Sequence, residues 1–310
     1  MPEYDIDMGP DPDKVLVAAD WHHHSAWASY VLAEAKKMGV DTIIQLGDLG
    51  YWPLRGGTFF SSLKNEVSDL GLRFYWLEGN HESVDQLTPG KSYGPLQHLP
   101  RGFRWQWWDK TWMSVGGGVS VDKRWRTPGH DWFPEETLSL AEATYCARPG
   151  EVDIVLSHDC PDQVDIPGLG EHAGWYPADA IAESEGHRAV LGEICDAVRP
   201  DLLLHGHYHI PHISSRKASG TRVIGLDRDG TSLEASTHLL TPELVVDPAP
   251  FIEIYRTSPG PYRGRSRPWR FRVRDAGGQV IVKGTESYDD RTEAIRDAGS
   301  VAPGARVVEV

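Results

Sequence analysis

The chain has 310 residues, of which 40% are hydrophobic and 25% are charged, a composition typical of a globular protein with one large domain and one small one. No apolar run approaches the roughly 20 residues of a membrane-spanning helix. Residues 1–14 have neither the basic nor the apolar region of a secretory signal, so we expect a cytoplasmic protein that does not contact membranes. The three cysteines suit neither a CxxC metal site nor a disulfide framework.

Acidic and basic residues are unevenly distributed along the chain. The net charge is −14, yet from Arg256 onward 11 Lys and Arg face 7 Asp and Glu. Long nucleic acids bind mainly through neutralisation of their phosphates, so the acidic body is a poor platform for them. The arginines that alternate along the basic tail indicate either a solvated strand face that pairs with the acidic body or a short nucleic-acid contact.

The first part of the chain alternates between strand and helix patterns. Apolar runs predict strands at residues 15–19, 42–46 and 74–77, and apolar side chains at helical spacing predict helices over residues 25–38 and 59–70. This β-α-β-α-β order favours parallel strands joined by right-handed crossovers.

Residues 85–150 interrupt that order with a tryptophan-rich insert. Residues 104–115 predict a hairpin that turns at residues 109–110, and residues 135–146 predict a helix. Between them, the glycines at 116–118 let the backbone turn sharply or approach another group closely. The tryptophans are most simply core and hairpin pairs, with the wall of a substrate pocket as the alternative.

The β-α-β pattern resumes at residue 151. A strand ends at His158, a helix covers residues 187–198, and a strand covers residues 202–204. A hairpin follows over residues 213–226. Because the run ends with antiparallel strands, we expect two packed sheets flanked by helices rather than one open sheet.

The C-terminal residues predict a separate unit. We expect a large domain over residues 1–254, a linker rich in Arg, Pro and Gly over residues 255–268, and a small ββαβ domain of unknown role over residues 269–310. The last segment is faintly similar to a small bacterial domain of uncharacterised function.

Polar side chains follow five of the predicted strands. In chain order they are Asp20, His22, Asp48, Asn80, His81, His158, His207 and His209. Ligands bind at the carboxyl ends of strands in α/β sheets, so these groups predict one polar site at one edge of the fold. Carboxylates, imidazoles and a carboxamide suit Mn²⁺, Fe or Zn²⁺, and also Co²⁺ or Ni²⁺.

The number of these groups suits two metal ions rather than one. A carboxylate can give one oxygen to each ion, and Asp48, which stands alone after a glycine, is the natural bridging ligand. A hydroxide held between the ions would be a nucleophile at neutral pH. An imidazole that binds no metal could protonate the leaving oxygen.

The order of these motifs resembles that of the calcineurin-like metallophosphoesterase family. The matching motifs are Asp20-Trp-His22, Gly47-Asp48, Gly79-Asn-His-Glu82, His158 and Gly206-His-Tyr-His209, within about residues 14–240. The resemblance implies an α/β fold, a two-sheet α/β/β/α sandwich, followed here by the small C-terminal α+β domain.

The resemblance also implies roles for individual residues. It assigns one metal ion to Asp20, His22, Asp48 and His209, and the second to Asp48, Asn80, His158 and His207. His81 would be the proton donor or a phosphate contact, oriented by Glu82 or Asp20. Tyr51 stands where the family often has a second acidic residue, and the Asp-Arg-Gly of protein Ser/Thr phosphatases is missing, which argues against a protein phosphatase.

We therefore expect a dimetal-dependent phosphoesterase, and first of all a phosphodiesterase that hydrolyses a small or nucleotide-like phosphate ester by in-line attack of the bridging hydroxide. Catalysis is assigned to His81, Asn80 and Asp48, with Mn²⁺ as the first choice of metal. Arg124, Arg126 and Trp132 follow the glycine turn and are predicted to bind a phosphate and a base, with surface charges on a loop as the alternative.

Two other functions fit the same residues. One is a metal-dependent nuclease of the same family that holds a nucleic-acid strand with the arginine-rich tail. The other is a non-catalytic metal-binding scaffold whose tail docks a partner. The intact His81 beside a full ligand set favours an enzyme.

Overall fold

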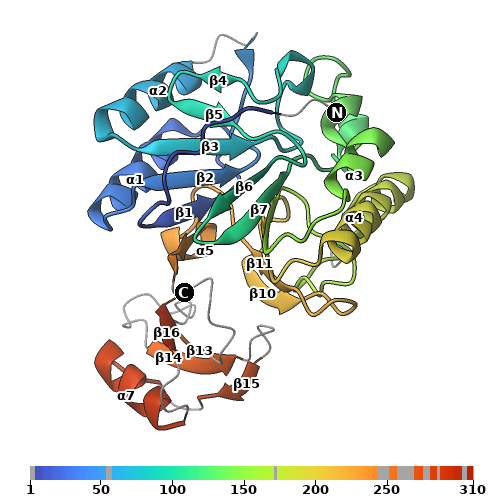
Figure 1. Cartoon of the computed structure of the whole chain (residues 1–310). Helices are drawn as coiled ribbons and strands as arrows, with labels where there is room; N and C mark the ends of the chain where they lie inside the picture. Colours follow the sequence, from blue (N-terminus) through green and yellow to red (C-terminus); the bar gives the residue numbers. More distant parts are fainter. Residues whose placement is uncertain are drawn as a thin grey trace.

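The computed structural model describes residues 4–53, 58–170, 173–242, 251–256, 269–274, 280–284, 287–301 and 306–309. Two six-stranded sheets and their helices form the body, and a four-stranded sheet with one helix lies below it in Figure 1. Among these residues, no helix is both long and apolar enough to cross a membrane.

The first sheet has the strand order β12-β1-β2-β3-β5-β4. Its strands are β1 (Val15–Ala18), β2 (Thr42–Leu46), β3 (Arg73–Leu77), β4 (Ser92–Tyr93), β5 (Leu96–His98) and β12 (Thr237–Leu240). The four central strands β1, β2, β3 and β5 are parallel, as the β-α-β pattern predicts. The edge strands β12 and β4 are antiparallel to their neighbours.

The second sheet repeats this plan in the order β10-β11-β9-β8-β7-β6. Its strands are β6 (Arg104–Trp107), β7 (Lys110–Val115), β8 (Ile154–Ser157), β9 (Leu202–His205), β10 (His212–Ser215) and β11 (Arg222–Gly225). Four parallel central strands again lie between two antiparallel edge strands. Both predicted hairpins, β6–β7 and β10–β11, are therefore confirmed.

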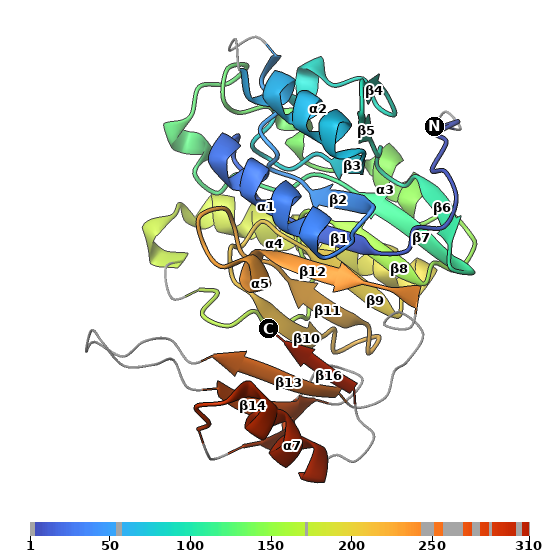
Figure 2. The same ribbon diagram turned by 90° about the vertical axis from the view of Figure 1, so that its left-hand side faces the viewer.

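Helices cover the outer face of each sheet. They are α1 (Ser25–Lys37) and α2 (Thr58–Leu70) on the first sheet, and α3 (Leu140–Cys146) and α4 (Ala178–Val198) on the second. Figures 1 and 2 show the resulting four layers, which confirm the predicted α/β/β/α sandwich. Side chains such as Val15 and Val17 pack between the sheets while Leu16 packs against the helices, so each strand is apolar on both faces.

The tryptophans of the hairpin are core residues, as expected, whereas Trp125 of the same insert is exposed. Trp105, Trp107 and Trp112 are buried between the sheets, and their rings lie 5.7–5.9 Å apart between centroids. Trp108 and Asp109 form the hairpin turn, one residue earlier than predicted, because Lys110 already pairs with Trp107. Both turn residues have positive φ, which is typical of a tight type I′ connection.

Two helices differ from their predicted bounds. The helix expected over residues 135–146 is split into the 3₁₀ turn η4 (Pro134–Glu136) and α3, because Ser139 and Glu142 form a capping box that starts a new helix. The helix expected from residue 187 begins at Ala178, since its first turns carry small and polar residues that show no apolar period.

The third sheet has the order β15-β14-β13-β16. Its elements are β13 (Phe251–Arg256), β14 (Trp269–Arg274), β15 (Val280–Lys283), β16 (Arg306–Glu309) and helix α7 (Arg291–Val301). The core between this sheet and α7 contains Ile252, Ile254 and Phe271. Because β13 pairs with β14 and β16, the predicted boundary at residue 254 falls inside a strand of this sheet. The division into domains stays a prediction.

The arginine-rich tail is described only in part. Arg272 forms an ion pair with Glu253 on the neighbouring strand, and Arg270 donates a hydrogen bond to Ser287. Arg263, Arg265 and Arg267 lie outside the described residues, so the two predicted roles of the tail stay open.

Candidate metal centre

The ends of five parallel strands, from both sheets, supply the predicted site residues. Asp20 and His22 follow β1, Asp48 follows β2, Asn80 and His81 follow β3, His158 follows β8, and His207 and His209 follow β9. Backbone geometry is unusual at five of these positions, because Asp20, His22, Asp48, His207 and His209 have φ between 45° and 68°. Left-handed backbone is uncommon for residues other than glycine, although Asp and His adopt it more readily than most, and it concentrates at functional sites.

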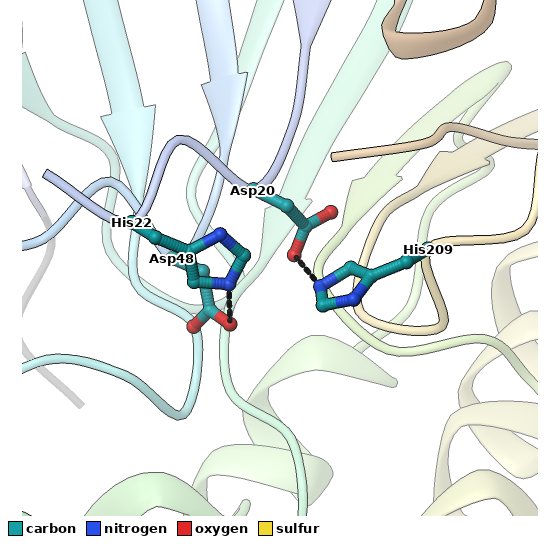
Figure 3. A group of neighbouring side chains, drawn as sticks. All are labelled: Asp20, His22, Asp48 and His209. Carbon is teal, nitrogen blue, oxygen red and sulfur yellow. Dashed lines mark ion pairs between the residues drawn. The ribbon is translucent and has the colours of Figure 1, made fainter. Parts of the chain in front are cut away.

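One half of the centre brings together Asp20, His22, Asp48 and His209. One ligand atom of each lies within 4.8 Å of the others, and Figure 3 shows the side chains converging. His22 Nε2 lies 3.5 Å from Asp48 Oδ2, and His209 Nε2 lies 3.5 Å from Asp20 Oδ1. His209 Nε2 is buried and has no hydrogen-bond partner among the described residues.

The other half is built around His158. Its Nδ1 lies 2.8 Å from the carbonyl of Leu46, which can only accept, so Nδ1 carries a proton. The opposite nitrogen, Nε2, lies 3.0 Å from Asn80 Oδ1 and 3.5 Å from Asp48 Oδ1. Three groups with lone pairs face one another here, and only a proton or a metal ion between them makes the arrangement favourable.

His207 completes this half. Its ring centroid lies 4.9 Å from that of His158, and burial lowers the pKa of His207 to about 4. A neutral imidazole is the form that binds a metal ion.

The electrostatics of the site favour positive charge. Burial tends to lower the pKa of His22, but Asp48, Asp20 and Asp229 together raise it to about 10. Burial likewise tends to raise the pKa of Asp48, yet the surrounding imidazoles bring it well below its ordinary value. Buried carboxylates and imidazoles present negative charge and lone pairs that protons or a cation must compensate. Oxygen and nitrogen donors of this kind bind divalent cations, so the residues fit the metal centre that the motifs predict.

Three motif glycines make room for this donor set. A Cβ added at Gly79 would lie 2.2 Å from Asp48 Oδ1, and one at Gly206 would lie 2.3 Å from Asp20 Oδ2. At Gly47, a Cβ would lie 2.5 Å from His158 Nδ1. Any side chain at these positions would displace a predicted ligand.

Asp229 is a site residue that the sequence did not reveal. Its carboxylate lies 2.9 Å from His22 Nδ1 and 2.7 Å from His24 Nδ1. A carboxylate on the far nitrogen of a metal-binding imidazole fixes the ring and raises its basicity. The segment around Asp229 carried only a turn signal, because its partner His22 is 207 positions away.

His81 is held by contacts other than the predicted ones. Its backbone N–H donates to Asp48 Oδ1 at 2.7 Å, and Arg126 donates to its ring Nε2 at 2.7 Å. Glu82, expected beside the ring, instead accepts from the backbone N–H groups of Gly50 and Gly79. Burial lowers the pKa of His81, which Asp48 opposes and the Arg126 charge reinforces.

Of the three predicted substrate contacts, only Arg126 is seen to contact a predicted site residue among those that the structure describes. The side chain of Arg126 is only 10% exposed and reaches the site through His81. Arg124 is 63% exposed and lies 3.5 Å from Asp179. The Lys123 ammonium group lies over the Trp132 ring, 5.5 Å from the ring centroid. As substrate contacts, these three residues stay predictions.

Carboxylates and imidazoles gathered at one edge of a two-sheet sandwich define an α/β protein of the metal-binding hydrolase class. Residues 13–211 match the family of calcineurin-like phosphoesterases, which is more than half of the chain. The protein therefore belongs to the calcineurin-like phosphoesterase family, as the motifs predicted.

Several solved structures are similar to this chain at low sequence identity. The TT1561 protein of Thermus thermophilus has 13% identity and a TM-score of 0.46, over 76% of this chain and 96% of its own. A dimetal phosphatase from Danio rerio has 12% identity and a TM-score of 0.45, over 88% of this chain and 100% of its own. A predicted phosphoesterase from Streptococcus pneumoniae has 10% identity and a TM-score of 0.34, over 90% and 99%. No curated protein sequence matches the chain.

Proposed function

We propose that this protein is a dimetal-dependent phosphodiesterase that hydrolyses a small or nucleotide-like phosphate ester. The observation that carries the proposal is the position of Asp48. Its Oδ2 faces His22 Nε2 and its Oδ1 faces His158 Nε2, each at 3.5 Å. Each oxygen of this carboxylate thus faces a different group of imidazoles. This arrangement is expected of a ligand that two ions share.

The ligands divide into two sets around Asp48. Asp20, His22 and His209 would hold one ion with Asp48, and Asn80, His158 and His207 would hold the other. When bound, two divalent cations lower the pKa of water and neutralise charge on a phosphoryl group. Mn²⁺ is our first choice, and the same nitrogen and oxygen donors suit Fe, Zn²⁺, Ni²⁺ or Co²⁺.

His81 and Arg126 would act on the phosphate itself. The His81 ring stands edge-on to the His22 ring, 5.5 Å between centroids, which puts it beside the ligands. Arg126 donates to His81 Nε2, so the neutral ring carries its proton on Nδ1. If a phosphate anion binds the guanidinium instead, the free Nε2 could take up a proton from solvent and pass it to the leaving oxygen, which returns the ring to its neutral form.

Exposed aromatic side chains support a nucleotide-like substrate. Trp125, directly before Arg126, is 64% exposed, and Trp175 on another loop is 72% exposed. The Trp125 ring lies 6.2 Å from that of Tyr176, between centroids. Exposed indoles can stack on a base, and we propose Arg124 and Trp132 as further contacts on the same segment.

Hydrolysis of two chromogenic esters tests the proposal. Metal-stripped protein is assayed with bis-p-nitrophenyl phosphate and p-nitrophenyl phosphate, with and without Mn²⁺. We expect metal-dependent turnover that favours the diester and is lost in Asp48→Asn. The matched control is Asp165→Asn, since Asp165 forms an exposed ion pair with Lys217.

Other results would contradict this function. Preference for the monoester would make the protein a phosphatase. Cleavage of single-stranded DNA with a steep negative salt dependence would make it a nuclease. Two bound ions without any hydrolysis would support the scaffold function.

A further inference from the structure

We propose that Ser120 and Glu136 are positioning residues that fix the side-chain amide of Asn80, so that its oxygen rather than its nitrogen faces the second metal position. The inference rests on the proposed role of Asn80 as a metal ligand. It concerns two residues of the tryptophan-rich insert.

The three side chains form a buried chain of hydrogen bonds. Asn80 Nδ2 donates to Ser120 Oγ at 3.1 Å, and Ser120 Oγ donates to Glu136 Oε2 at 2.7 Å. The backbone N–H of Ser120 donates to the other carboxylate oxygen at 2.7 Å. Asn80, Ser120 and Glu136 are 4%, 1% and 2% exposed, so water does not compete for these bonds.

Glu136 sets the donor-to-acceptor direction of these hydrogen bonds. Burial raises the pKa of Glu136 to about 7, so its carboxylate is ionised above that pH. An ionised carboxylate can only accept, so the Ser120 hydroxyl then donates its single hydrogen to Glu136. The hydroxyl then has only lone pairs left for Asn80, which must present its NH₂ group. The amide oxygen is thereby turned toward His158 Nε2, 3.0 Å away.

The direction matters because a carboxamide is nearly symmetric in shape. Its oxygen and nitrogen are almost the same size, and only their hydrogen-bond partners decide which one faces a given side. A cation is bound by the carboxamide oxygen. Without the Ser120 acceptor, rotation of the amide would turn the NH₂ group toward the second metal position.

The backbone of the insert is locked around the same chain. Gly118 N donates to the carbonyl of Glu136 at 3.0 Å, and a Cβ at Gly117 would lie 2.4 Å from that carbonyl oxygen. A Cβ at Gly118 would lie 3.1 Å from His158 Cδ2 and 3.3 Å from His207. The glycine turn thus approaches the second half of the centre closely and holds Ser120 beside Asn80.

Arg101 fixes the other side of this unit. Its guanidinium donates to the carbonyls of Glu135 and Glu136, at 2.9 and 3.3 Å, and to Glu78 at 2.6 Å. Arg101 and Glu78 are both buried. Glu136 therefore reaches Ser120 from a rigid support.

Metal binding by two variants tests the inference. Ser120→Ala removes the acceptor, and Glu136→Gln places an NH₂ group where Oε2 accepts, which frees the hydroxyl to donate to Asn80 Oδ1. Mn²⁺ titration calorimetry and Co²⁺ absorption spectra of metal-stripped protein, recorded at about pH 8 where Glu136 is ionised, report each site without an activity assay. We expect the Kd of one of the two ions to rise about 10–100-fold in both variants, with the other unchanged.

Kinetics gives a second readout. At limiting Mn²⁺ we expect kcat to fall by the same factor while KM for the diester stays constant, and excess Mn²⁺ should restore kcat. The control is Ser114→Ala, because Ser114 is also buried and its hydroxyl donates to the Pro100 carbonyl at 2.7 Å. Its two Kd values should match those of the wild type.

Three results would overturn the inference. Both Kd values could be unchanged in folded Ser120→Ala and Glu136→Gln, which would show that the chain does not position the ligand. Both sites could weaken equally in these variants and in Ser114→Ala, which would indicate a general packing defect. Wild-type protein that binds no metal ion would overturn the proposed function and this inference with it. If the wild type binds two ions, the variants test the role of Ser120 and Glu136 independently of the proposed function.

Discussion

At the scale of single residues, Asp48 contacts groups from two other strand ends at once. Asp48 Oδ1 accepts the backbone N–H of His81 at 2.7 Å while it also faces His158 Nε2. The ligand and the predicted proton donor are therefore fixed relative to each other by a single contact. Arg126 holds the imidazole of His81 from the opposite side.

His81→Ala should lower kcat for the diester by about 10²-fold or more, because it removes a general acid whose contribution is typically 10²–10⁴-fold. The fold and both metal sites should persist, since the lost ring is not among the proposed ligands. Steady-state kinetics, circular dichroism and metal content check this. His130→Ala, an exposed histidine, is the control. Full activity in His81→Ala would remove His81 from the mechanism.

At the scale of elements, the loop after β3 leaves no room for a side chain at its glycine, whereas helix α4 has room at Gly186. Gly79 follows β3, and a Cβ there would lie 2.2 Å from Asp48 Oδ1 and 2.5 Å from Asp48 N. Gly186 lies within α4, and a Cβ there meets no described atom within 4 Å. The two glycines allow a matched comparison.

Gly79→Ala should abolish metal binding and lower the melting temperature, because real Cβ atoms do not approach other atoms so closely. Gly186→Ala should instead stabilise the protein by about 0.5–1 kcal/mol, since alanine favours the helix. Thermal unfolding and Mn²⁺ titration of both variants check this. Normal metal binding by Gly79→Ala would show that the loop after β3 has room to move.

The turn η4 makes stability depend on pH through Glu136. Burial raises the pKa of this carboxyl group to about 7, although its hydrogen bonds from Ser120 oppose the shift. Between the ordinary pKa of Glu, about 4.3, and 7, the folded state binds a proton that the unfolded state has lost. Stability should therefore fall as pH rises through this range, by about 1.4 kcal/mol for each unit of the shift.

Glu136→Gln should remove this part of the pH dependence, because the amide does not titrate. Denaturant unfolding of metal-stripped wild type and variant, from about pH 4 to 8, isolates the difference. Parallel stability curves for the two proteins would show that Glu136 has an ordinary pKa.

At the scale of the whole molecule, the metal centre joins the two sheets. Asp20, His22, Asp48 and Asn80 come from the first sheet, and His158, His207 and His209 come from the second. Bound ions would therefore connect the two halves of the sandwich. Without ions, the carboxylates and imidazoles compensate one another only through protons, as the raised pKa of His22 indicates.

Removal of metal should lower the melting temperature, and Mn²⁺ at about 100 times its Kd should restore about 2.7 kcal/mol for each ion that binds only the folded state. Differential scanning calorimetry with a chelator and with added Mn²⁺ measures this. Asp48→Asn should lose most of the response, whereas Asp165→Asn should keep it. A melting temperature that does not change with metal would mean that the centre does not stabilise the fold.

Much of this architecture could be predicted because its signals are local. Five of the central strands are short apolar runs followed by polar residues, so these strands and the predicted ligands could be read together. The strand β13 was missed because it runs into the segment rich in Arg, Pro and Gly and its partners β14 and β16 begin well after it in the chain. The helix α4 was predicted too short because its first turns lack an apolar period.

The sequence by itself determined the sandwich and the family and predicted a ligand set, because apolar period and strand-end motifs are properties of neighbouring residues. Only the tertiary structure decided which residues support those ligands. Asp229 reaches His22 across 207 positions, Arg126 reaches His81 across 45, and Ser120 reaches Asn80 across 40. The physical reason is that hydrogen bonds between distant loops depend on how the folded chain brings those loops together, and no local pattern in the sequence records that.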